Sequence, residues 1–391
     1  MLFPPVDPNE RFRSRRAAAR RRKRLRRAAA VSAVLIGVAL LSVGAQFVTT
    51  SGSPSENVQS APVVATPSVG ARALPVEIRG VHVTMGLASL PGKLEEYLDL
   101  ERDGLTALEL DLKDENGQVG FTSPGVPLAA NVGAVRDYYS ARAAARLAHE
   151  RDVYLIGRVV VFEDPILARG RRDLAIQWPD GSVWRDSAGL GWTNPYDRRV
   201  WDYNVDIAVA AARAGFDEIM FDYVRFPSDG DVESAIYRNR GALSKQEAIP
   251  AFLRYAARRL ERHDVRISAA VFGLSASRDL GIGQLPRRMA PHLDGMYAMT
   301  YPSLFGSGEL GIADPSAAPG ETVARALRRF AIRLRGTRVL VVPWVQDFSF
   351  TTPFEFEQVR AQIDAARRAG AKGFMLWNAE GVYTDGVLAP A

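Results

Sequence analysis

The chain of 391 residues contains no cysteine, which excludes three kinds of chemistry. There is no disulfide framework, no thiolate nucleophile and no cysteine metal site. Histidine is also scarce, and the four residues show no pairwise spacing typical of a metal site. We interpret His82 as a satisfied core residue, and His149 and His263 as cations near the ends of basic helices. The sequence therefore predicts no metal ligands, and a deacetylase, which would need a metal cluster, is not supported.

Two common catalytic motifs are missing as well. No Gly-x-Ser-x-Gly elbow is present, so a serine hydrolase is not supported. No Gly-x-Gly-x-x-Gly turn follows the first apolar run, Gly80–Met85, so the dinucleotide-binding fingerprint is absent. We therefore expect no cofactor.

Basic charge is concentrated at the N-terminus. The sequence pI is about 9.6, which at first suggests a nucleic-acid partner. Of the 50 Lys and Arg and 44 Asp and Glu residues, however, 11 basic and 2 acidic ones lie within residues 1–50. The other 341 residues then hold 39 basic and 42 acidic side chains, so the main part of the chain is slightly acidic. This balance argues against binding to a phosphate backbone.

The N-terminal residues have the pattern of a membrane anchor. Residues 1–27 are basic, and residues 28–48 form an uncharged stretch of 21 residues rich in Val, Leu, Ile and Ala. Such a stretch is long enough to span a bilayer, and the basic residues before it favour a cytoplasmic N-terminus. We predict a single-pass protein of the bacterial inner membrane with its main domain outside the cytoplasm. A cleaved signal sequence, with Val43-Gly44-Ala45 as the cleavage site and a secreted product, is the alternative.

A linker and one large domain follow the anchor. Residues 49–75 are rich in Ser, Pro, Thr, Val and Gly, a composition typical of a disordered linker. Residues 76–391 alternate apolar runs with amphipathic stretches. The expected strands are Gly80–Met85, Leu105–Leu112, Val153–Phe162, Glu218–Asp222, Val265–Phe272, Gly295–Tyr301, Arg338–Val345 and Gly373–Trp377. The expected helices are Leu94–Arg102, Val135–Glu150, Val200–Ala214, Lys245–Arg262, Thr322–Arg335 and Phe356–Ala369.

This alternation predicts an α/β fold, a (β/α)8 TIM barrel. Eight repeats in about 310 residues fit a barrel, which usually takes ~250 residues before insertions. A doubly wound open sheet is the alternative, but the first strand lacks the Gly-rich phosphate turn of such folds. Active sites in TIM barrels are built at the carboxyl ends of the strands. We therefore expect the polar residues at those ends to be the functional ones.

The segment 215–227 supplies the first catalytic candidate. Side chains alternate along a strand, so Glu218, Met220 and Asp222 share one face, while Ile219 and Phe221 take the other. A buried carboxylate at the carboxyl end of a strand is costly unless it is paired or used. We expect Arg225, three residues later, to pair with Asp222, and the alternative role for this pair is purely structural.

The motifs at the strand ends resemble those of a bacterial family of glycoside-hydrolase-like proteins, long catalogued as a domain of unknown function. The most specific motif is Phe-Asp-Glu-Ile followed by Phe-Asp-Tyr-Val-Arg-Phe-Pro at residues 216–227. Further matching motifs lie at residues 110–114, 160–165, 194–204, 299–308, 343–348 and 376–384. The resemblance covers about residues 78–386. It implies a TIM-barrel hydrolase that acts on a cell-surface or extracellular polysaccharide.

Glycoside hydrolysis usually requires two carboxyl groups, one as acid and one as nucleophile or base. Asp222 is our nucleophile or base. Asp347 follows an apolar strand containing Trp344, a setting that favours a protonated acid, although it could simply cap a turn. Asp111 is the next candidate, because Glu109, Asp111 and Lys113 are expected to share a face. Glu380, which follows the final apolar run, is the fourth and lowest-ranked candidate.

Other polar and aromatic residues are expected to bind substrate. Trp178, Trp184, Trp192 and Tyr196 cluster in a long segment, residues 163–199, and such a loop either binds ligand or packs its own small core. Arg158 lies inside an expected strand and needs a carboxylate partner if it points into the barrel. The proposed substrate-binding residues are Arg225, Lys113, Asp114, Arg158, Tyr196, Tyr301, Trp344, Trp377 and Asn378.

The sequence therefore predicts a membrane-anchored, extracytoplasmic glycoside hydrolase with a polysaccharide or oligosaccharide as its partner. A non-catalytic glycan-binding barrel, which keeps the aromatic residues without a working acid pair, is the alternative. Neither the sugar nor the linkage follows from the sequence, and the oligomeric state does not either.

Overall fold

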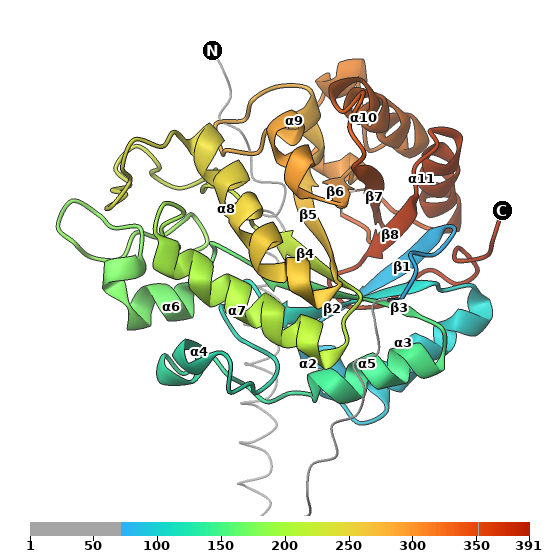
Figure 1. The fold of residues 1–391 in the computed structure, drawn as a ribbon. Helices are drawn as coiled ribbons and strands as arrows, with labels where there is room; N and C mark the ends of the chain where they lie inside the picture. The colour runs from blue at the N-terminus through green and yellow to red at the C-terminus, as the bar shows by residue number, and fades with distance from the viewer. Residues whose placement is uncertain (1–71, 351) are drawn as a thin grey trace, which may run out of the picture. The chain divides into compact units, whose positions relative to one another are not determined.

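The computed structural model describes residues 72–350 and 352–391 (Figure 1). The predicted basic segment 1–27, the predicted membrane span 28–48 and nearly all of the predicted linker 49–75 lie outside the described residues. Within the described ranges, no helix combines the length and the apolar character needed to cross a membrane.

Eight parallel strands form a closed barrel, in which each strand pairs with the next and β8 pairs with β1. All eight predicted strands are present, and their ends differ from the prediction by no more than two residues. The closed order confirms the (β/α)8 architecture and excludes the doubly wound sheet. The strands are β1 (Ile78–Val83), β2 (Ala107–Lys113), β3 (Tyr154–Val160), β4 (Glu218–Asp222), β5 (Arg266–Phe272), β6 (Gly295–Met299), β7 (Leu340–Gln346) and β8 (Gly373–Trp377).

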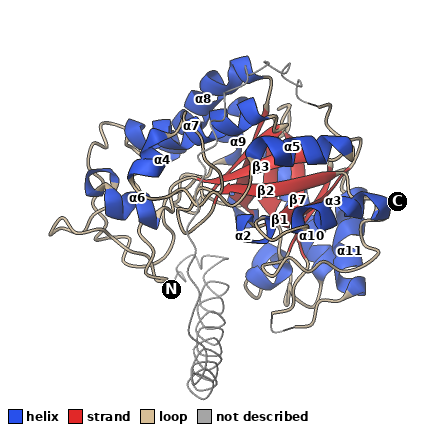
Figure 2. Cartoon of the chain, turned by 90° about the horizontal axis from the view of Figure 1, so that it is seen from below, coloured by secondary structure: helices blue, strands red, loops and turns tan. Residues whose placement is uncertain are grey.

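Helices surround the barrel, as Figure 2 shows with the strands in red at the centre. The connection between β5 and β6 is an exception, because α9 is only four residues long. The helices are α2 (Met85–Ala88), α3 (Lys93–Leu98), α4 (Pro127–Asn131), α5 (Ala141–Glu150), α6 (Pro165–Gly170), α7 (Arg198–Ala214), α8 (Lys245–Leu260), α9 (Pro286–Met289), α10 (Pro319–Arg333) and α11 (Phe356–Arg368).

Local capping explains where these helices begin and end. The Asp197 side chain accepts a hydrogen bond from the Arg199 amide at the start of α7, and Gly215, with φ 106°, ends the helix in the left-handed region. The predicted helix Val135–Glu150 was wrong at its start. The Ser140 side chain caps α5 at Ala141, and Val135 instead forms a β-bridge with Val119.

The two faces of each strand have different chemistry. On β4, Ile219 and Phe221 are fully buried and belong to the apolar core cluster. Glu218 and Asp222 on the opposite face contact polar side chains of other strands inside the barrel, as the alternation predicted. The core between barrel and helices is therefore apolar, whereas the barrel interior carries buried charge.

Candidate functional site

The guanidinium of Arg158 joins two carboxylates inside the barrel. Arg158 lies near the carboxyl end of β3, between Asp111 on β2 and Asp222 on β4, and it pairs in register with Asp111. Its Nη1 lies 2.6 Å from Asp111 Oδ1, and its Nη2 lies 2.8 Å from Asp222 Oδ2. All three residues are at least 93% buried. The site therefore holds a carboxylate, a guanidinium and a second carboxylate on adjacent strands.

The pairing explains how so much charge is buried. Burial alone would lower the pKa of Arg158, but Asp222 and Asp111 raise that pKa well above its usual value. Arg158 therefore stays a cation. The partner of Asp222 was predicted to be Arg225, and here the prediction was wrong. The Arg225 guanidinium packs over the rings of Trp192, Tyr223 and Phe272 and donates to the Phe226 carbonyl.

The backbone turns sharply directly after Asp222. Tyr223 has a φ of 49°, a left-handed conformation that is uncommon for a bulky residue. This conformation lets the Tyr223 amide donate to Asp222 Oδ1 at 2.7 Å. Asp222 thus receives hydrogen bonds on both carboxylate oxygens, since Oδ2 accepts from Arg158. Strained backbone of this kind is found preferentially at functional sites.

His82 adds a second charged pair beside the first. Its Nδ1 lies 2.5 Å from Glu109 Oε2, and its Nε2 lies 3.7 Å from Asp111 Oδ2. Burial alone would lower the pKa of His82, but Asp111 and Glu109 raise it above the usual value. The imidazole also stacks on Trp377, with an interplanar angle of 15°. His82 was interpreted as a satisfied core residue, and it is indeed buried and has polar partners, but these partners are carboxylates beside Arg158.

Lys113 does not lie on the face that the sequence predicted. The register between β2 and β3 shifts between Asp111 and Lys113, which sends Lys113 to the opposite face from Asp111. Its Nζ lies 2.7 Å from both Asp164 Oδ2 and Asn204 Oδ1, and the side chain is fully buried. Lys113 is therefore part of the contact between the barrel and α7, away from Arg158.

The turn after β2 holds two more carboxyl groups, and one of them lies close to Arg158. Glu115 Oε2 lies 3.8 Å from Arg158 Nη1. Asp114 is held within its own turn, where its side chain accepts from the Asn116 and Gln118 amides. Burial, with Glu115 as the next cause, raises the pKa of Asp114 to about 7. Asp114 can therefore change its charge near neutral pH.

Asp347 follows β7, on another part of the barrel rim. Its two oxygens accept from the amide and the hydroxyl of Thr384, and its backbone carbonyl accepts from Asn378. Burial raises the pKa of Asp347, although the hydrogen bonds from Thr384 act in the opposite direction. Asp347 is 3% exposed, whereas Glu380 is exposed to solvent. Asp347 therefore has the environment expected for an acid, and Glu380 does not.

Aromatic rings line the same end of the barrel. The rings of Tyr301 and Phe348 lie 6.0 and 5.7 Å from that of Trp377, and Trp344 contacts His82 edge-on at 6.3 Å. Burial, followed by the charge of Asp222, raises the pKa of Tyr301. Tyr301, Trp344 and Trp377 therefore lie together beside the buried charges.

The long segment 163–199 instead packs a small core of its own. Trp184 and Trp192 are fully buried, and Tyr196 packs against Phe226 and Tyr237 at 5.0 and 5.7 Å between ring centres. The segment was predicted either to bind ligand or to pack its own small core, and for these three rings the structure supports the core. Tyr196 does not contact the Arg158 cluster.

The prediction missed His82 and Glu109 as site residues, and Glu115 as a neighbour of Arg158. Alternation along β2 places Glu109 on the face of Asp111, whereas His82 joins them through the register of β1 with β2, which no local sequence pattern reports. Among residues 72–350 and 352–391, no group of three or more His, Asp or Glu side chains is arranged to hold a metal ion. The arrangement can instead supply carboxylates, a fixed cation and aromatic surfaces.

The sequence profile of a family described as "Putative glycosyl hydrolase domain" matches residues 80–383. The chain belongs to this family. The match covers all of the barrel except the first two residues of β1, and it includes all the residues of the Arg158 cluster. A search of curated protein sequences gave no match.

Two solved glycoside hydrolases have the same fold, and a third solved structure is similar in sequence to part of the chain. The glycoside hydrolase domain of PgaB (BpsB) from Bordetella bronchiseptica is 13% identical, with a TM-score of 0.56 over 78% of this chain and 95% of that one. A GH20 exo-β-N-acetylglucosaminidase from Vibrio harveyi is 14% identical, with a TM-score of 0.50 over 77% of this chain and 50% of that one. A hypothetical protein from Ruminiclostridium thermocellum is 35% identical, with a TM-score of 0.45 over 48% of this chain and 96% of that one.

Proposed function

We propose that this member of the glycosyl hydrolase family cleaves glycosidic bonds of a cell-surface or extracellular polysaccharide by a two-carboxylate mechanism. The observation that carries the proposal is the Arg158 guanidinium between Asp111 and Asp222 at the carboxyl ends of adjacent strands. TIM-barrel active sites are built at this end. Buried charges of this number are costly to keep unless they serve a function or stabilise each other.

Asp222 is the proposed nucleophile or base. Arg158 and the Tyr223 amide hold one carboxylate oxygen each, which fixes the direction of the group. A fixed carboxylate can attack the anomeric carbon or take a proton from an attacking water molecule, and the spacing of the two carboxyl groups decides between these routes. In either case the reacting sugar would lie beside Tyr301, whose ring is close enough to Asp222 for the carboxylate to raise its pKa.

Asp347 is the proposed acid. Its pKa is raised by burial, so it can keep a proton and give it to the leaving-group oxygen. Asp111 is less suited to this role, because its carboxylate is already bound by Arg158, whose Nη1 lies 2.6 Å from Asp111 Oδ1. Asp114 can hold a proton, but its carboxyl group already accepts three hydrogen bonds within its own turn.

We further propose that the domain acts outside the cytoplasm, tethered by residues 28–48. The support is the uncharged stretch itself, with basic residues on its N-terminal side. A tethered hydrolase would reach polymers at the cell surface, which agrees with the polysaccharide substrate proposed above.

The test is a reducing-end assay with the purified full chain on a panel of bacterial exopolysaccharides and cell-wall glycans. We expect release of reducing ends from at least one polymer, and we expect Asp222→Asn to abolish it. The matched control is Asp206→Asn, which removes a half-buried carboxylate on α7 that pairs only with Arg259. If the chain binds a glycan of the panel but releases no reducing ends at any pH, the barrel is a glycan-binding protein and the proposed chemistry is wrong.

A further inference from the structure

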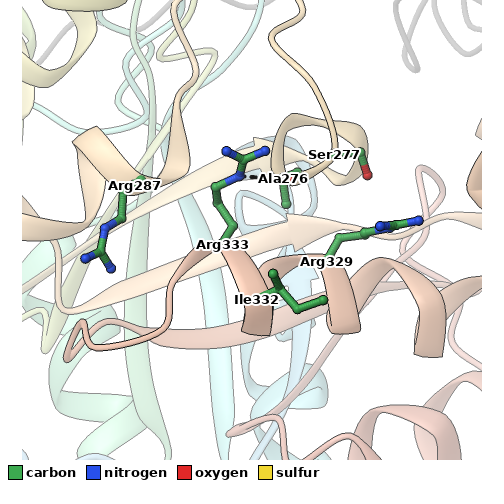
Figure 3. Close-up of a pocket in the computed structure, with 6 residues that line it drawn as sticks. All are labelled: Ala276, Ser277, Arg287, Arg329, Ile332 and Arg333. Carbon is green, nitrogen blue, oxygen red and sulfur yellow. Dashed lines mark hydrogen bonds between the residues drawn. The ribbon is translucent and has the colours of Figure 1, made fainter.

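The outer wall of the barrel between α9 and α10 carries a row of three open hollows. The first is lined by Ser275 and Leu285 with arginines of α9 and has a volume of about 280 Å³. The second, of about 310 Å³, shares Arg287 and Arg333 with the first (Figure 3). The third, of about 390 Å³, shares Arg329 and Ile332 with the second. Each volume lies near the lower end of the ~300–1,000 Å³ range of small-ligand pockets.

Arginines dominate the lining of all three hollows. We call this row the arginine track, and its cations are Arg278, Arg287, Arg288, Arg325, Arg328, Arg329 and Arg333. Among the described residues, Asp279 is the only acid that lines it. The cluster is not a consequence of overall charge, because residues 51–391 hold slightly more acidic than basic side chains.

Most of these cations have no ion-pair partner. The two end arginines are paired, Arg278 with Glu309 at 2.8 Å and Arg325 with Glu321 at 2.5 Å. For Arg287, Arg288, Arg328, Arg329 and Arg333, no carboxylate of the described residues lies within 4.0 Å. All five are exposed to solvent. The middle of the track therefore presents uncompensated positive charge.

Two backbone contacts hold the middle of the track in place. The Arg333 Nε donates to the Ala276 carbonyl at 3.1 Å, the dashed line in Figure 3, and Arg287 Nη1 donates to the Arg335 carbonyl at 2.6 Å. A guanidinium has five N–H donors, so each of these groups keeps donors for a ligand. Arg329 and Ile332 project from α10 beside them. The fixed guanidiniums can thus bind planar anions in the two-pronged geometry that suits carboxylates.

The lining also restricts the kind of anion. Ile332, which is 54% exposed, separates the second and third hollows, and Leu310 and Pro286 line the outer ones. Aliphatic side chains beside guanidiniums suit a ring with an apolar C–H face and a charged edge. No aromatic ring of the part of the chain that the structure describes lines the hollows, although single-stranded nucleic acids are usually bound by stacking on such rings. A row of connected hollows suits a linear polymer.

We propose that the arginine track binds a linear polysaccharide that carries a carboxylate on its sugar units. Each hollow holds a short stretch of the polysaccharide. The carboxylates of the sugar units bind the guanidiniums, and the faces of the sugar rings pack on the aliphatic side chains. Binding at this wall does not require the hydrolysis proposed above. An experiment can therefore contradict either proposal and leave the other intact.

The test measures binding of fluorescent oligogalacturonates to the full chain, with neutral malto-oligosaccharides of the same length for comparison. Affinity should rise with chain length until the track is filled, fall with ionic strength, and be absent for the neutral sugars. The triple variant Arg287→Ala/Arg329→Ala/Arg333→Ala should bind about tenfold to a hundredfold more weakly. The matched control is Arg142→Ala/Arg146→Ala/Arg213→Ala, which removes the same charge from exposed positions on α5 and α7 and should leave binding unchanged.

A second pair of variants guards against a folding defect. Arg329 makes no hydrogen bond to another described residue, so Arg329→Glu should leave thermal unfolding unchanged and still weaken binding, whereas Arg142→Glu should not. Equal losses in the track and control variants would mean that binding follows net charge, and the proposal would be wrong. It would be equally wrong if the track variants lost binding to single-stranded DNA or to phosphatidylglycerol vesicles while oligogalacturonate binding stayed intact.

Discussion

Arg158 holds Asp222 through a single carboxylate oxygen, at 2.9 Å from Nε and 2.8 Å from Nη2. Arg158 is 7% exposed and Asp222 is 6% exposed, so water screens this pair little. Because Nη1 of the same group binds Asp111, the two carboxylates depend on one cation. Any change at Arg158 therefore affects both of them.

The first prediction concerns the stability that Arg158 provides. Arg158→Met keeps the length of the side chain but leaves two buried carboxylates without their cation, and breaking a buried pair this way typically costs about 3–5 kcal/mol. We expect a loss of that size in the free energy of urea unfolding at neutral pH. The control is Arg142→Met on the exposed face of α5, with an expected change within about 0.5 kcal/mol. A loss at position 158 no larger than in the control would contradict the buried pair.

The second prediction concerns Asp347 as the acid. Asp347→Asn cannot donate a proton, so kcat on a polysaccharide should fall by about 10²–10⁴-fold. The loss should be much smaller on an aryl glycoside with a dinitrophenyl leaving group, because such a group departs without protonation. A matching loss on both substrates would show that Asp347 is not the acid, and Asp111→Asn and Asp114→Asn would then be compared in the same assay.

Thr384 gives a third prediction for the same group. Its amide and hydroxyl donate to Asp347 and stabilise the charged form of that carboxyl. These two hydrogen bonds lower the pKa of Asp347 and so oppose the larger rise that burial causes. Thr384→Val removes the hydroxyl donor, so the pKa of Asp347 should rise. The acid then keeps its proton to higher pH, and the alkaline limb of the kcat profile should move upward. If the alkaline limb stays in place or moves to lower pH, Asp347 is not the acid whose proton controls kcat.

The sequence was sufficient for the fold, because its signals are local. Apolar runs such as Glu218–Asp222 show strand alternation directly, and Gly215 marks the end of the helix before that run. The contacts between the charged residues of the site were harder to predict from the sequence. The register shift that moves Lys113 off the face of Asp111 depends on hydrogen bonds with β3, and no residue pattern within β2 reports it. The partner of Asp222 was therefore sought nearby in sequence, at Arg225, although it lies 64 residues away at Arg158.

His82 shows the same limit for a single residue. Nothing around it in sequence distinguishes a core histidine from one that binds two carboxylates. Its role depends on the register of β1 with β2, which places it beside Glu109, and on Trp377 from β8. Contacts between distant strands thus decided which charged residues form the site.

The fourth prediction uses the raised pKa of His82. The folded protein binds this proton more tightly than the unfolded chain, whose histidine pKa is about 6.5. The stabilisation is therefore complete below about pH 6.5 and is lost as the pH rises through the higher folded-state value. Urea unfolding at a series of pH values above 6 should show stability falling with pH, and the fall should be smaller in His82→Gln. If the two proteins show the same slope, the imidazole does not gain its proton on folding. His292→Gln is the control, because its pKa is lowered in the fold.

The last prediction tests the anchor and exploits the lack of cysteine, since any cysteine introduced into this chain is the sole thiol. Arg142→Cys places it on the exposed face of α5, and Ser14→Cys places it in the basic segment 1–27. In bacterial spheroplasts, a membrane-impermeant maleimide should label Cys at position 142 at once and Cys at position 14 only after lysis, with both proteins of full length in the membrane fraction. A cleaved signal sequence gives a different result, because the position-142 thiol would then be on a shortened, soluble protein. Labelling of position 142 only after lysis would place the barrel in the cytoplasm and overturn both the anchor orientation and the extracytoplasmic substrate.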